Sequence, residues 1–108
     1  MNIGQIAKMA KQMQAQMAQV QQELAETTLE ATAGGGAVRI VITGAQEVRS
    51  VEIDPSAVDA AEVEMLQDLF ISAINEAISR SKALEQDRLG KIAGGMGLPG
   101  MPGLPGFG

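Results

Sequence analysis

In this chain of 108 residues, the side chains that most often act in catalysis are either absent or lack the second side chain that would activate them. It has no cysteine and no histidine, which removes the thiol nucleophile, the usual general base and the commonest metal ligand. Its serines therefore have no histidine to activate them. Glu62, Glu64 and Asp68 lie close together on a predicted helix, but without an aromatic or apolar pocket they are typical of a solvated surface. We expect no enzyme active site, no metal and no cofactor.

The net charge of −5 argues at first against a nucleic-acid partner, but the charges are unevenly placed. Residues 1–22 carry two lysines and no acid, residues 23–79 carry eleven acids and two arginines, and residues 80–91 carry four basic residues and two acids. Basic ends around an acidic middle permit phosphate contacts, although a solvated mixed surface explains the same charges. The candidate nucleic-acid contacts are Lys8, Lys11, Gln12, Arg80, Lys82, Arg88 and Lys91.

The first predicted element is a long helix over residues 2–25, with Asn2 as its N-cap. Its apolar residues recur with the spacing of one helical stripe. They are Ile6, Met9, Met13, Met17, Val20 and Leu24. A methionine-rich stripe of this kind is typical of a packing surface.

Three short strands are predicted next, over residues 27–32, 38–43 and 47–53. Gly34–Gly36 permits a tight reversal and is predicted as the first turn. A phosphate-binding loop is not expected there, because the Lys-Ser/Thr pair that such a loop requires does not follow the glycines. The result is an antiparallel meander with one face toward the core. We place Val38, Ile40, Ile42, Val51 and Ile53 on the inner face, and Val41 and Val48 on the outer face.

A second long helix is predicted over residues 60–89. Pro55 ends the third strand, Asp59 and Glu62 have the spacing of a capping box, and Gly90 is a plausible C-terminal cap. Its apolar face is Val63, Leu66, Phe70, Ala73, Ile74, Ala77, Ile78 and Leu84. The chain thus divides into one α+β domain, residues 1–89, and a flexible tail rich in Gly, Leu, Pro and Met, residues 90–108.

The lengths of these elements predict a homodimer. A strand of six or seven residues is only about 22 Å long, whereas the first helix is about 35 Å and the second about 45 Å. One small sheet cannot cover both apolar stripes, so some of that surface meets a second copy or projects as an arm. The candidate packing and dimer residues are Met13, Met17, Val20, Leu24, Val41, Val48 and Phe70.

No apolar run reaches the roughly 20 residues that a membrane span requires, and the N-terminus lacks the apolar block of a secretory signal. Together with the absence of cysteine, this predicts a cytoplasmic protein without a membrane partner.

Several segments, taken in order, resemble the YbaB/EbfC family of nucleoid-associated proteins. They are Met9–Gln14, Gly34–Gly36, Val51–Pro55, Met65–Leu69, Ala73–Ala77 and Gly94–Gly100. The resemblance implies an α-β-β-β-α protomer and a homodimer with protruding helices. It also implies binding of double-stranded DNA through the terminal helices, a change in DNA conformation, and roles in nucleoid organisation and gene regulation. The acidic total is unusual for such a protein.

A second hypothesis remains open. The methionine-rich helix and the tail of residues 90–108 would also suit a module that binds another protein. Neither hypothesis calls for a small-molecule substrate.

Overall fold

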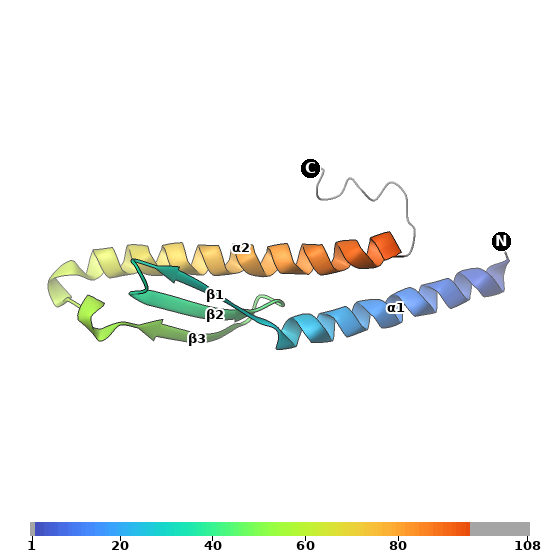
Figure 1. Ribbon diagram of the computed structural model, residues 1–108, viewed down its shortest axis with the longest axis horizontal. Coiled ribbons are helices and arrows are strands. Elements are labelled where there is room, and N and C mark those ends of the chain that lie inside the picture. The colour runs from blue at the N-terminus through green and yellow to red at the C-terminus, as the bar shows by residue number, and fades with distance from the viewer. Residues whose placement is uncertain (1, 96–108) are drawn as a thin grey trace.

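A computed structural model describes residues 2–95 as two long helices flanking a three-stranded antiparallel sheet (Figure 1). The elements are α1 (Ile3–Glu26), β1 (Thr28–Ala33), β2 (Val38–Thr43), β3 (Val48–Ile53) and α2 (Val63–Gly95). The strand order is β1-β2-β3, so the predicted α-β-β-β-α meander is confirmed. The predicted tail lies outside the described residues from position 96 onward.

The two helices divide the molecule into two parts (Figure 1). The first part of α2 covers the sheet, whereas α1 extends beyond the sheet along the remainder of α2. We call residues 27–81 the sheet half, and residues 2–26 together with 82–95 the helical half. With 33 residues, or about 50 Å, α2 is long enough to belong to both.

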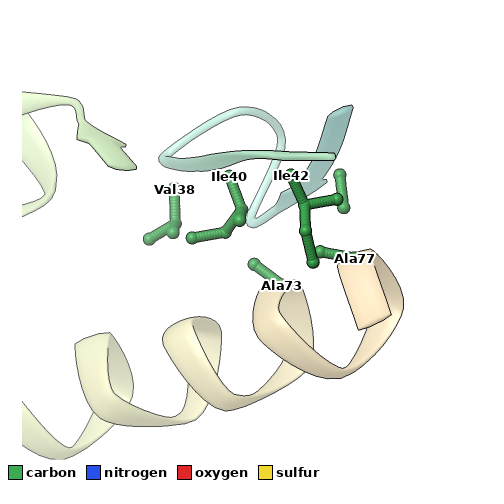
Figure 2. Close-up of a cluster of buried hydrophobic side chains, with 6 residues drawn as sticks. Val38, Ile40, Ile42, Ala73 and Ala77 are labelled. Atoms are coloured by element: carbon green, nitrogen blue, oxygen red, sulfur yellow. The ribbon is translucent and has the colours of Figure 1, made fainter. Parts of the chain in front are cut away.

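The core lies between β2 and α2 (Figure 2). Val38, Ile40 and Ile42 alternate along β2, so all three point to the same face of the sheet, and each is at most 1% exposed. Ala73 and Ala77 meet them from α2, one helical turn apart, and their small side chains let the helix approach the strand closely.

The inner face of β3 is left uncovered, although the sequence placed its apolar residues in the core. Ile53 pairs with Val38 and Val51 pairs with Ile40, so both share the core face of the sheet. They remain 38% and 46% exposed because α2 packs on β1 and β2. A helix about 10 Å wide covers roughly two strands spaced about 4.8 Å apart, and the third strand is left bare.

The predicted outward position of Val48 is wrong. The ladder pairs Val41 with Ser50 but Ile42 with Val48, so Arg49 is an extra residue in β3. This bulge reverses the alternation that a regular strand would have and places Val48 opposite Ile42, on the inner face.

The end of β3 follows the sequence analysis. Pro55 opens a short 3-10 turn, Pro55–Ala57. The backbone N–H of Ser56 and the Ser56 hydroxyl each donate to Asp54 Oδ1 at 2.9 Å. Both bonds favour the ionised carboxylate, so they lower the pKa of Asp54 below its ordinary value.

The helix ends differ in part from the prediction. Asn2 caps α1, since its Oδ1 accepts from Gln5 N at 2.7 Å. Asp59 accepts from Ala61 N and so caps a 3-10 turn, Ala60–Glu62, rather than forming the predicted capping box of α2. Gly90 does not end α2, which continues through residue 95. Glycine inside a helix costs about 1 kcal/mol, but the half-buried Ile92 continues the apolar face beyond it.

Hence residues 90–95 of the predicted tail belong to α2.

The glycine turn between β1 and β2 allows a stability prediction with its own control. Gly34 and Gly35 have almost equal left-handed φ angles, +66° and +67°. A Cβ on Gly34 would lie 2.9 Å from Leu69 Cδ1, whereas a Cβ on Gly35 would meet nothing within 4 Å. Gly35→Ala should therefore cost about 1 kcal/mol of unfolding free energy through backbone strain. Gly34→Ala should cost about 1 kcal/mol more through crowding.

The measurement is urea denaturation of the three proteins at one chain concentration. Equal losses in the two variants would show that Leu69 moves aside freely and would contradict the predicted difference.

Candidate nucleic-acid interface

The exposed side of α1, a helix that we call the arm, is rich in lysine and amide side chains. Residues 3–12 are all exposed, and the helix carries no acid before Glu23. Lys8 and Lys11 are three residues apart, so they lie on neighbouring positions of one helix face, opposite the apolar stripe. Gln12 is on this polar face as well. Ammonium and amide groups presented along a helix in this way suit contacts with a phosphate backbone.

The distal part of α2 supplies the other cations of the helical half. Lys82 is exposed and Arg88 is half-buried. Lys91 lies one turn after Asp87, and its Nζ is 3.2 Å from Asp87 Oδ2. That pair is exposed and adds little stability, so it leaves the Lys91 ammonium accessible to another anion.

Arg80, also predicted as a contact, is exposed but bonds to α2 and to the sheet. Its Nε donates to Glu76 Oε1 at 2.9 Å, and its Nη1 donates to the Glu30 carbonyl oxygen at 3.3 Å. The guanidinium thus bridges α2 to the free edge of β1. The sequence identified the charge of Arg80 but could not show that it is already engaged.

The two remaining arginines of the sheet half are engaged in a similar way. On the outer face of the sheet, Arg39 lies between Glu30 and Glu52 and forms an ion pair with each. Arg49 Nη2 is 3.5 Å from Glu47 Oε1 and also donates to the Ala25 carbonyl oxygen. The sheet half therefore offers an approaching phosphate no arginine that is free of such contacts.

Charge is consequently separated along the molecule. The sheet half has nine carboxylates and three arginines, whereas the helical half has five basic residues and four carboxylates. Within residues 2–95, the cations that lack an ion-pair partner are Lys8, Lys11, Lys82 and Arg88, all in the helical half. The sheet half therefore has a large negative charge that disfavours a polyanion, whereas the helical half is close to neutral and contains the unpaired cations.

The predicted packing residues separate into two groups. Leu24 is fully buried, and Phe70 packs against the core, so both stabilise the single chain. The others are at least partly accessible. These are Met13, Met17, Val20, Val41 and Val48.

An apolar surface that the sequence did not predict lies beside β3. Val48, Val51 and Ile53 form its strand side, and Ile74, 39% exposed, lies on the flank of α2 toward β3. The helical spacing places Ile74 there, because Arg80 marks the opposite flank by its bond to β1. The width of one helix compared with three strands is the signal that would have revealed this surface. We call these four residues the β3 surface.

Residues 2–95 bring together no group of three side chains able to hold a metal ion. None of the helices they form has the length and apolar character of a membrane span.

Comparison with known proteins identifies the family of this chain. The YbaB/EbfC DNA-binding family matches residues 1–96. A nucleoid-associated protein of Moorella thermoacetica is 48% identical over 103 residues, which cover 93% of this chain and 99% of the relative. One from Chloroflexus aurantiacus is also 48% identical, over 89% of this chain and 96% of its own.

The crystal structure of an uncharacterized protein from Helicobacter pylori has the same fold, with a TM-score of 0.78 at 21% identity. The match covers 85% of this chain and 97% of that one. The chain therefore belongs to the YbaB/EbfC DNA-binding family, which is not a family of enzymes.

Proposed function

We propose that this protein binds double-stranded DNA with low sequence specificity as a homodimer, through the helical half of each protomer. In the bacterial nucleoid it alters the conformation of DNA and so contributes to nucleoid organisation and gene regulation. The observation that carries the proposal is the separation of charge, because the cations free of ion pairs within residues 2–95 all lie in the helical half. Membership of the family supports DNA as the polyanion.

Low specificity follows from the kind of side chain available. Lysines bind phosphates, which are the same at every base pair. The chain has no Trp or Tyr, and Phe70 packs against the core, so residues 2–95 present no aromatic platform for unpaired bases. This composition favours a duplex backbone over a single strand.

The β3 surface supports the homodimer. An apolar strip along an edge strand is a typical subunit interface, and a two-fold contact buries it on both copies at once. Each dimer would then carry two α1 arms and twice the number of free cations. An arm of 24 residues is about 36 Å long, roughly one turn of B-DNA. Two arms on one duplex would restrain its path, which is how we expect the conformation of DNA to change.

We expect a loss of affinity for DNA when the arm lysines are neutralised. Lys8→Gln with Lys11→Gln should weaken binding to every duplex, whatever its sequence. The slope of log affinity against log salt should fall by about 0.9 for each lysine that contacts a phosphate. The measurement is a fluorescence anisotropy titration of unrelated duplexes at several salt concentrations.

Ser72→Asp with Asn75→Asp is the matched control. It changes the net charge by the same amount, but both positions are exposed on α2 in the sheet half. The proposal expects the lysine variant to bind much more weakly than this control. Equal effects would mean that only total charge matters, and tighter binding to single strands would contradict a duplex partner.

A further prediction concerns the dimer. Val51→Lys should convert it to a monomer, because the ammonium can reach water from the 46% exposed Val51 site of a single chain but would be buried unpaired in a dimer. Ser50→Lys is the control, since its neighbouring position points to the outer face. Light scattering should give twice 11.2 kDa for the wild type and for Ser50→Lys, and 11.2 kDa for Val51→Lys.

A dimer that survives Val51→Lys but is disrupted by Ser50→Lys would place the interface on the outer face of the sheet and refute this assignment.

A further inference from the structure

A buried serine connects the middle of α2 to the turn between β2 and β3. Ser81 is fully buried, and its Oγ donates to the Thr43 carbonyl oxygen at 2.6 Å. The Ser81 Oγ also accepts hydrogen bonds from Gln46 N at 3.1 Å and from Gln46 Nε2 at 2.9 Å. One donor and two acceptor positions are all that a hydroxyl has, so the hydrogen-bonding capacity of Ser81 is used completely.

The turn itself is constrained. Gln46 has a φ of +60°, a left-handed conformation that a residue with a side chain adopts only at a cost. Its amide reaches back to the Gly44 carbonyl oxygen at 2.9 Å, and the Thr43 side-chain oxygen accepts from two further backbone N–H groups of the turn. The contacts with Ser81 help to hold this conformation in place.

The same turn holds the end of α1. Gly44 N donates to the carbonyl oxygens of Leu24 at 2.9 Å and Thr27 at 3.0 Å. A Cβ on Gly44 would lie 2.8 Å from Leu24 Cδ2 and 3.2 Å from Leu84 Cδ2, so the two leucines close around the glycine. We call Leu24, the turn at Thr43–Gln46, Ser81 and Leu84 the Ser81 joint.

Beyond this joint, the arm is supported mainly by a limited contact with α2. Leu24 is the only buried residue of α1, Met13, Val20 and Ala25 are half-buried, and residues 2–12 are all exposed. A straight helix points wherever its base is directed, so a small rotation at Leu24 moves Lys8 and Lys11 by many ångströms. The cations of the arm are therefore placed mainly by contacts in the Ser81 joint, more than 12 residues away along the chain.

We propose that the Ser81 joint is the positioning element that sets the direction of the α1 arm relative to the sheet half, and that DNA affinity depends on it. The dependence of DNA affinity on the joint rests on the proposed function, whereas the direction of the arm is a property of the protein alone. Ser81→Ala removes the hydroxyl and should let the arm move. Gly44→Ala places a methyl against Leu24 and should redirect the arm without freeing it.

The direction of the arm can be measured directly, because the chain has no cysteine and introduced thiols are unique. Nitroxide labels at Gln14→Cys on α1 and Asn75→Cys on α2 report the arm against the sheet half, and both positions are exposed. Mixing with an excess of unlabelled protein makes dimers with two labelled protomers rare, so the distances measured are those within one protomer. Pulsed electron spin resonance then gives the distribution of label distances.

We expect one narrow distribution for the wild type, a broadened one for Ser81→Ala and a displaced one for Gly44→Ala. Ser79→Ala, an exposed serine of the same helix, is the control and should leave the distribution unchanged. Circular dichroism checks that each variant is folded. If Ser81→Ala does not fold, Gln46→Asn takes its place, because asparagine tolerates the left-handed conformation while its shorter amide loses Ser81.

Measuring DNA affinity separates the role of the joint in directing the arm from its role in DNA binding. If the loosened arm holds the binding direction about one fifth of the time, the apparent Kd for a duplex rises roughly fivefold. Distance distributions that match the wild type in both Ser81→Ala and Gly44→Ala would overturn the joint. A broadened distribution with unchanged affinity would overturn its role in binding. If the wild type binds no duplex, the proposed function fails, and the distance distributions still test whether the joint sets the direction of the arm.

Discussion

The contact between β2 and the alanine face of α2 is the constraint on which the rest of the structure depends. Because Ala73 and Ala77 have small side chains, the helix sits close on β2 and is centred there. Its width then reaches β1 on one side and leaves the inner face of β3 uncovered on the other. The core is consequently small, and the apolar residues of the β3 surface remain exposed. The same helix continues beyond the sheet and provides the neighbour along which α1 extends (Figure 1).

The arrangement reconciles a net charge of −5 with a polyanionic partner. The excess of carboxylates belongs to the sheet half, where ion pairs also engage all three arginines. The arm is acid-free over most of its length, and solution ions screen charges more than about 8–10 Å apart. A phosphate at the arm therefore experiences mainly the nearby lysines, while the distant acidic half disfavours binding in other orientations. An acidic protein can bind a nucleic acid when its charges are separated by more than this screening length.

Periodicity predicted most of the fold because helices and strands repeat their apolar residues at different intervals. Both long helices, the three strands and the Asn2 cap followed from local pattern. The bulge at Arg49 could not, since it depends on pairing with β2, and the continuation of α2 past Gly90 depends on tertiary contacts that outweigh a glycine. For the candidate interface, the positions of the charges were visible in the sequence. Their pairing was not, because Glu30 lies fifty residues from Arg80 and meets it only in the fold.

The composition of α1 explains why an arm needs a joint. Ala, Gln, Met and Lys are strong helix formers, so the 24-residue helix can persist with few contacts to the rest of the chain. Internal hydrogen bonds keep such a helix straight, but they do not fix its orientation relative to the rest of the protein. Direction has to come from its base, and there Gly44 permits the close approach of Leu24 while Ser81 fixes the turn that carries Gly44. Local propensity thus makes the arm rigid, and a few long-range contacts at one end make that rigidity useful for placing charge.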